Sequence, residues 1–121
     1  MSAKHVLRNR SFDYSVRIVK LSRFLRQEHK EYDLSQQILR SGTAIGSLIR
    51  EAQNAESTKD FIHKLSIAQK ECDETAYWLE LLHVTDYLNQ QEFESMYDEA
   101  VQLLKMLRSA IITSKKKLTN S

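Results

Sequence analysis

The sequence of 121 residues contains two glycines, no proline and one cysteine. Folds rich in β-turns need glycine and proline at those turns, so this scarcity argues against sandwiches and barrels and favours a few long helices. A lone cysteine excludes an internal disulfide bond, which is typical of a reducing compartment. No run of 18 apolar residues occurs, and the first ten residues, MSAKHVLRNR, lack the apolar stretch of a signal peptide. We therefore expect a cytoplasmic protein without membrane contact.

The charged residues are strongly segregated along the chain, although the formal net charge is only +2. Residues 1–30 carry a net charge of +6, residues 31–100 a net charge of −9, and residues 101–121 a net charge of +5. Such asymmetry predicts an acidic partner for the two ends of the chain, or pairing between copies of the chain. The alternative is that acidic and basic helices lie side by side and neutralise each other.

Apolar residues recur at intervals of three and four residues in four segments of one domain spanning residues 1–121. The predicted helices are about 12–28, 34–53, 58–86 and 90–115. Because the breaks between these segments are short, successive helices should be antiparallel neighbours. The fold class predicted from the sequence is therefore all-α, an antiparallel up-down-up-down four-helix bundle.

Polar residues with N-cap preferences precede each predicted helix. They are Ser11, Asp33, Ser57 and Asn89. Gln36 and Glu92 stand three residues after two of them, which is the spacing of a capping box. At the other end of the chain, we expect the basic tail Lys115–Lys117 to fray.

A second line of apolar or small residues runs beside the first on several predicted helices. The residues that we assign to helix packing or an oligomer interface are Leu39, Gly42, Gly46, Ile49, Tyr77, Leu81 and Val84. Surplus apolar surface usually marks an interface, so we expect a homo-oligomer; a wide core face is the alternative. Two glycines within about one turn cost about 2 kcal/mol relative to alanine. They predict a close helix contact, either within a subunit or between subunits.

The residues that could carry catalysis or bind a metal do not form a recognisable site. Glu80 and His83 have the Glu-x-x-His spacing of di-iron bundles, and Asp60 and His63 form a looser version. Both pairs lie on one predicted helix, about 30 Å apart at 1.5 Å per residue, so they cannot share a metal cluster. Cys72 falls in an apolar stripe, which predicts a buried side chain. We expect no enzyme, no cofactor and no metal; an enzyme acting on a small ligand or through a metal is the weakest alternative.

Basic residues indicate nucleic-acid binding instead. In an antiparallel bundle the predicted helices 12–28 and 90–115 are neighbours, and their cations would form one strip that contacts the phosphates of RNA or DNA. The candidate phosphate contacts are Arg10, Arg17, Lys20, Arg23, Arg108, Lys115, Lys116 and Lys117. The alternative is a protein-interaction scaffold or accessory subunit, in which the second apolar lines and the acidic helix 58–86 engage a partner protein such as a nucleic-acid enzyme.

Two of the predicted helices carry a sequence that resembles a known family. Residues 34–55 read LSQQILRSGTAIGSLIREAQNA, residues 60–68 read DFIHKLSIA, and residues 74–79 read ETAYWL. These stretches resemble the four-helix-bundle family of bacterial proteins encoded in intervening sequences of 23S ribosomal RNA genes. The family is also labelled a ribosomal-protein family, and it includes the accessory variability determinant of diversity-generating retroelements.

The resemblance implies further properties. The residues that match the family motif are Arg40, Ser41, Gly42, Ile45, Gly46, Arg50 and Glu51. The residues that differ from it are Ala44, Ser47 and Leu48. A bundle of this family is expected to assemble as a homopentameric barrel. It is also expected to present a basic surface to nucleic acid or a reverse transcriptase, with no established enzymatic activity.

Overall fold

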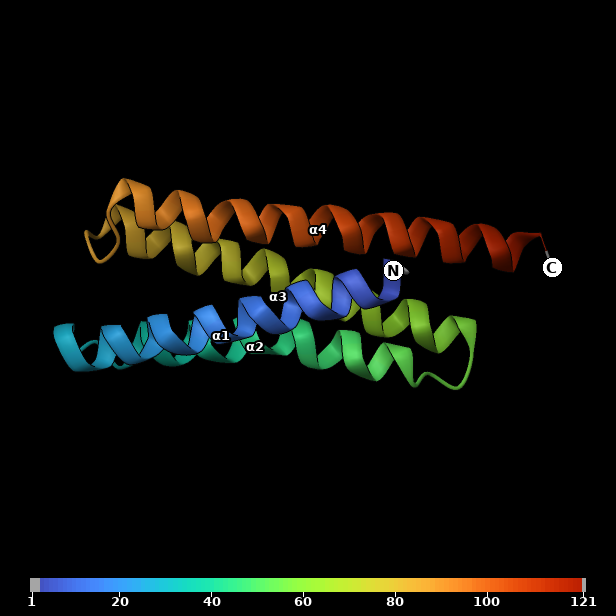
Figure 1. Cartoon of the computed structure of the whole chain (residues 1–121), viewed down its shortest axis with the longest axis horizontal. Helices are drawn as coiled ribbons and strands as arrows, with labels where there is room; N and C mark the ends of the chain where they lie inside the picture. The colour runs from blue at the N-terminus through green and yellow to red at the C-terminus, as the bar shows by residue number, and fades with distance from the viewer. Residues whose placement is uncertain (1–2, 121) are drawn as a thin grey trace.

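The computed structural model describes the backbone of residues 3–120 and the side chains of residues 5–120. Within this range the chain forms four α-helices: α1 Ala3–His29, α2 Asp33–Gln53, α3 Thr58–Val84 and α4 Gln90–Thr119. Successive helices run antiparallel along one bundle (Figure 1). The pairs α1–α2, α2–α3 and α3–α4 pack extensively, whereas α1 and α4 approach each other at few points. The predicted all-α four-helix bundle is confirmed.

The beginnings of α3 and α4 follow from local sequence. The Ser57 hydroxyl accepts a hydrogen bond from the Asp60 N–H at 3.0 Å, as its predicted N-cap role requires. Asn89 and Glu92 form a complete capping box, in which each side chain accepts a hydrogen bond from the other's backbone N–H. These contacts satisfy backbone donors that a helix start leaves unpaired.

The start of α2 differs from the prediction. Asp33 is its first helical residue and Tyr32 takes the N-cap position without a side-chain hydrogen bond. The free backbone donors are satisfied by Glu31, whose Oε1 atom accepts from the N–H groups of Leu34 at 2.5 Å and Ser35 at 3.2 Å. The predicted Asp33–Gln36 capping box is therefore replaced by a carboxylate from the preceding turn.

The outer ends of the bundle also differ from the prediction. Helix α1 begins at Ala3 and not near residue 12, because Leu7 continues the apolar period one heptad upstream of Tyr14 and packs in the core. Ser11 is consequently buried inside the helix, where its hydroxyl donates to the Arg8 carbonyl at 3.0 Å. Helix α4 continues to Thr119, so Lys115–Lys117 are helical and not frayed.

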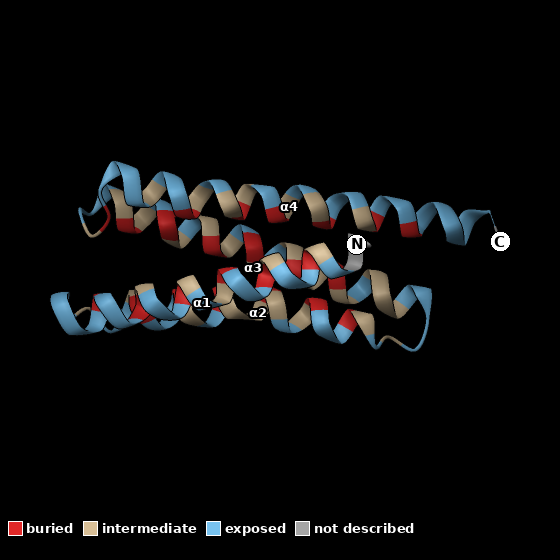
Figure 2. Ribbon diagram, viewed as in Figure 1, coloured by how far each residue is buried: buried red, intermediate tan, exposed pale blue. Residues whose placement is uncertain are grey.

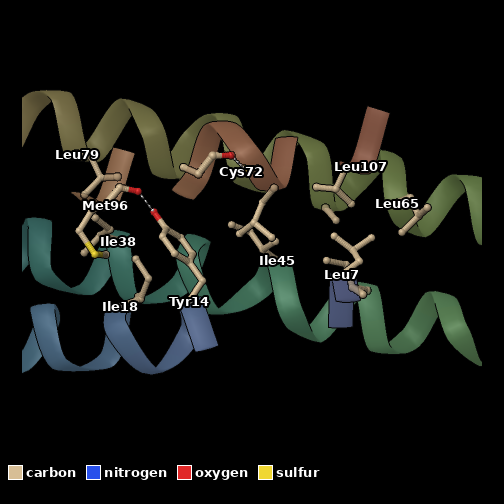
Figure 3. Packing of buried hydrophobic residues seen from close by; sticks show 14 of the residues in the cluster. Leu7, Tyr14, Ile18, Ile38, Ile45, Leu65, Cys72, Leu79, Met96 and Leu107 are labelled. Atoms are coloured by element: carbon tan, nitrogen blue, oxygen red, sulfur yellow. Dashed lines mark hydrogen bonds between the residues drawn. The ribbon is translucent and has the colours of Figure 1, made fainter. Parts of the chain in front are cut away.

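The core is one cluster to which all four helices contribute (Figures 2 and 3). Buried hydroxyls join the helices within it. The Tyr14 hydroxyl donates to the Met96 carbonyl at 3.0 Å and links α1 to α4 (Figure 3). Thr75 donates to the Ser41 hydroxyl at 2.9 Å and links α3 to α2. These bonds satisfy polar groups that would otherwise be costly to bury.

The two glycines lie where α1 packs against α2. A Cβ atom on Gly42 would come within 2.7 Å of three side-chain carbons of Ile18, which is fully buried. A Cβ on Gly46 would lie 3.2 Å from the Ser15 hydroxyl and 3.3 Å from the Ser11 carbonyl oxygen. The close helix contact predicted from the glycines is therefore present within the subunit.

Much of the second apolar line belongs to the core. Ile49 is buried, Leu39 packs against the core cluster, and both glycines pack against α1. For these residues the structure shows the wide core face and not surplus surface. Helix α3 differs, because Tyr77 is 55% exposed and Val84 is 71% exposed, with Leu81 half-buried between them. We name Tyr77, Leu81 and Val84 the α3 apolar face.

We expect Gly42→Ala to lower the free energy of unfolding by about 1–2 kcal/mol. Overpacking costs about 1–3 kcal/mol, and a Cβ 2.7 Å from the fully buried Ile18 should cost about 2–3 kcal/mol, of which the helix propensity gained by removing glycine returns about 1 kcal/mol. Urea denaturation measures the change. Gly46→Ala should cost less because its contacts are looser, and Ile18→Ala in the Gly42→Ala background should show favourable coupling. An unchanged or higher unfolding midpoint for Gly42→Ala would contradict the close contact.

We expect the Cys72 thiol to be inert in the folded protein. The thiol donates to the Ala100 carbonyl at 3.2 Å, and burial, together with the Asp73 carboxylate, raises its pKa from 9.0 to about 12. An aromatic disulfide reagent at pH 8 should therefore label the unfolded chain far faster than the native one, because the thiolate is the nucleophile.

The same shift predicts a pH dependence of stability. Between about pH 9 and pH 12 the folded chain keeps a proton that the unfolded chain loses, so stability falls as the pH rises through this window. Because burial also raises the pKa of Tyr14, Cys72→Ala isolates the contribution of the thiol. Fast labelling of the native protein at pH 8 would contradict the burial.

Candidate nucleic-acid interface

Ion pairs join α2 and α3. Arg40 forms ion pairs with Glu71 at 3.1 Å and with Glu74 at 2.6 Å, and Lys64 pairs with Glu51 at 3.6 Å. The hydrogen bond from Arg40 lowers the pKa of the Glu74 carboxyl, whereas burial raises that of Glu71. These ion pairs connect α2 to α3 and do not involve the cations of α1.

Two of the predicted phosphate contacts face α4. The Arg10 guanidinium makes a bidentate contact with Glu99, with Nε–Oε2 at 3.1 Å and Nη2–Oε1 at 2.6 Å. The hydrogen bond to Glu99 raises the pKa of Arg10, so the guanidinium stays charged and its donors are engaged by Glu99. Arg17 donates to the Ser95 hydroxyl at 2.5 Å. Both arginines thus help to hold α1 against α4.

The other predicted contacts are exposed but do not join these two in one strip. Lys20 lies on the exposed surface of α1, while Arg23 borders a hollow on the α2 side of α1. On α4, Arg108 lies near Cys72 of α3, whereas Lys117 borders the groove described below. Lys115 and Lys116 are exposed on the last turns of α4. The expected α1–α4 strip is therefore divided among different sides of the bundle.

The cations of α1 remain largely without carboxylate partners. Within residues 5–120, the arginines and lysines that form ion pairs are Arg10, Arg40 and Lys64. The α1 cations outside these pairs are Arg8, Arg17, Lys20, Arg23 and Arg26. Neutralisation by an acidic neighbouring helix, the alternative raised by the sequence, therefore applies to Arg10. The other α1 cations form a basic face.

The seam between α1 and α2, on the outside of the bundle, gathers residues that the sequence analysis did not predict as nucleic-acid contacts. Arg8, Phe12 and Arg50 border two hollows of about 470 and 370 Å³. The Arg50 guanidinium carbon lies 5.9 Å from the centroid of the Phe12 ring. The sequence holds a signal for Phe12, because this aromatic residue falls outside the apolar spacing of Tyr14, Ile18, Leu21 and Leu25. Its pairing with Arg50 depends on the α1–α2 contact, which the sequence alone does not place.

An apolar groove of about 460 Å³ lies where α1 begins and α4 ends. Its walls include Leu7, Phe61 and Met106, and Lys105 and Lys117 also line it. The last turns of α4 extend beyond the start of α1 (Figure 1). This groove is a second concave region, distinct from the α1–α2 seam.

The residues weighed for metal binding have other contacts. The His83 ring stacks on Phe93 with centroids 4.4 Å apart, and the Asp60 carboxylate accepts from the Glu56 N–H at 3.2 Å. Across the described residues, no group of three or more His, Cys, Asp or Glu side chains gathers in a way that could hold a metal ion. Among residues 3–120, likewise, no helix has both the length and the apolar character needed to cross a bilayer.

Comparisons with known proteins agree with this architecture. A crystal structure of a protein of unknown function from the S23 ribosomal protein family of Bacteroides thetaiotaomicron VPI-5482 is similar, with a TM-score of 0.90 and 48% sequence identity. The match covers 91% of this chain and 98% of that one. No curated protein matches the chain. The family model for the 23S rRNA-intervening sequence protein matches residues 4–109. The chain therefore belongs to the 23S rRNA-intervening sequence protein family.

Proposed function

We propose that this protein is a non-enzymatic, cytoplasmic bundle that binds RNA or DNA through the basic face of α1, without a cofactor, and acts as a homo-oligomer. The observation that carries the proposal is the set of α1 cations without carboxylate partners. Arg8, Lys20 and Arg23 are exposed, and within residues 5–120 none of them forms an ion pair. A phosphate backbone is the polyanion that such a row of cations binds, with release of counterions.

The basic end of α4 supplies a second group of cations. Arg108 and Lys115–Lys117 are exposed and carry no ion pair within the described residues. In a homo-oligomer, the α4 cations of one copy and the α1 cations of another would add to one larger electrostatic field. The homopentamer implied by the family resemblance would repeat this field five times.

Phosphate binding predicts a steep dependence on salt. We expect Lys20→Gln with Arg23→Gln to weaken binding of a fluorescent RNA or DNA oligonucleotide. The slope of log affinity against log salt concentration should fall by about 0.7–0.9 for each phosphate that is no longer neutralised. Fluorescence anisotropy across a salt titration measures both quantities.

The matched control is Lys59→Gln with Lys70→Gln, which removes the same charge from exposed positions on α3. This control should leave affinity and slope close to those of the parent protein. If both double variants bind the oligonucleotide equally weakly, net charge alone would explain the loss of affinity. Absence of any binding at low ionic strength would reject the function itself.

Self-association is supported by the α3 apolar face. Exposed apolar surface on a helix is usually covered by a partner, and a second copy is the partner that we propose. Native mass spectrometry should give a multiple of the 14.2 kDa chain. Val84→Glu should lower that mass, because it places a charge in the interface. Ile112→Glu, at an exposed position on α4, is the control.

The same face favours the second candidate function, a scaffold or accessory subunit for another protein. A parent protein that remains a 14.2 kDa monomer at working concentration would contradict self-association. The α3 apolar face would then be left for a partner of another kind. The salt titration with RNA or DNA distinguishes the two candidate functions, because only the first requires nucleic-acid binding.

A further inference from the structure

We propose that the outer seam between α1 and α2 is a binding track for single-stranded nucleic acid, in which the Phe12 ring stacks on a base. This inference rests on the nucleic-acid binding proposed above and specifies the strand type, the surface and the contacts. It moves the centre of recognition from the α1–α4 side to the α1–α2 side.

The environment of Phe12 is suited to a planar ligand. The side chain is 55% exposed on the outside of the bundle, where a large apolar ring gains nothing from the core. The two hollows beside it, of about 470 and 370 Å³, share Arg8, Phe12 and Arg50 as lining residues. Aromatic rings flanked by cations are the elements that bind unpaired bases, since every base has a π-face.

The polar residues around Phe12 distinguish bases from phosphates. The hydroxyls of Ser15, Thr43 and Ser47 line the larger hollow. Ser15 and Thr43 donate to the Ser11 and Leu39 carbonyls, so their oxygens provide acceptors for the amino groups of a base. Two carboxylates also border the hollows: Glu51, which pairs with Lys64, and Asp13. Carboxylates repel phosphate but accept hydrogen bonds from base amino groups, so Glu51 and Asp13 suit the edge of a base, while Arg8 and Arg50 suit the adjacent phosphates.

The seam continues with the same chemistry toward the end of α1. Arg23 and Arg26 border a third hollow of about 290 Å³ together with Leu39 of α2. The Arg26 guanidinium carbon lies 5.9 Å from the centroid of the exposed Tyr32 ring, which repeats the pairing of Arg50 with Phe12. At 1.5 Å per residue, Phe12 and Arg26 are about 21 Å apart along α1, which is room for several nucleotides.

A duplex would not use this surface in the same way. Base faces are stacked inside a duplex, so the Phe12 ring can reach a base only in a single strand, a loop or a frayed end. The cations alone would bind the phosphates of a single strand or of a duplex. Stacking on Phe12 is therefore the part of the interaction that separates the single strand from the duplex.

The test compares oligonucleotides that differ only in their bases. The probes are a labelled 12-nucleotide DNA strand and an abasic strand of equal length, which keeps the phosphates. Phe12→Ala should weaken binding of the base-bearing strand by about 5- to 150-fold. It should leave the affinity for the abasic strand and the slope of log affinity against log salt concentration unchanged. Phe12→Trp should restore binding.

Phe24→Ala is the matched control, because Phe24 is an exposed aromatic of the same helix that contacts His29 and borders none of these hollows. The inference is overturned if the parent protein binds both strands equally, or if Phe12→Ala weakens the abasic strand as much. It is also overturned if Phe12→Ala changes the native mass, since Phe12 would then belong to an interface between copies. A parent protein that binds neither strand nor duplex at low salt would instead reject the proposed function.

Discussion

The packing of Ile18 against the bare backbone of Gly42 fixes the relation between α1 and α2. Ile18 occupies the space that a Cβ atom would need, so the two helices approach more closely than side chains at that position would allow. The contact of Gly46 with Ser11 and Ser15 extends this approach toward the start of α1. The helical cost of two glycines is offset by this packing, and the outer seam between the helices takes its shape from it.

The charges of the bundle are arranged around that seam. Glu71 and Glu74 of α3 bind Arg40, and Glu99 of α4 binds Arg10, so these charges are matched between neighbouring helices. Exposed ion pairs of this kind contribute little to stability, but they fix orientation and occupy the acids. Arg8, Arg26 and Arg50 are left on the outside, where they lie beside Phe12 or Tyr32. Part of the charge segregated in the sequence thus lies along the outer α1–α2 seam, while the cations of α4 lie on other sides of the bundle.

The apolar surface is divided in a comparable way. Helix α2 buries both of its apolar lines, because α1 packs on one side and α3 on the other. Helix α3 buries one line and leaves Tyr77 and Val84 exposed. An interface on α3 and a basic seam on α1 and α2 use different sides of the bundle. Assembly and nucleic-acid binding are therefore compatible in one molecule.

The number of helices, their approximate bounds and the caps at Ser57 and Asn89 were determined by the sequence, because apolar period and capping are local properties. The family was also recognisable from the motif around Gly42 and Gly46. The start of α1 was missed, although Leu7 stands one heptad before Tyr14 and extends the apolar period upstream. Which cations share a surface was decided only by the tertiary structure. Arg10 and Arg23 lie on one helix yet face different neighbours, and Arg50 meets Phe12 only because Gly42 lets two helices come together.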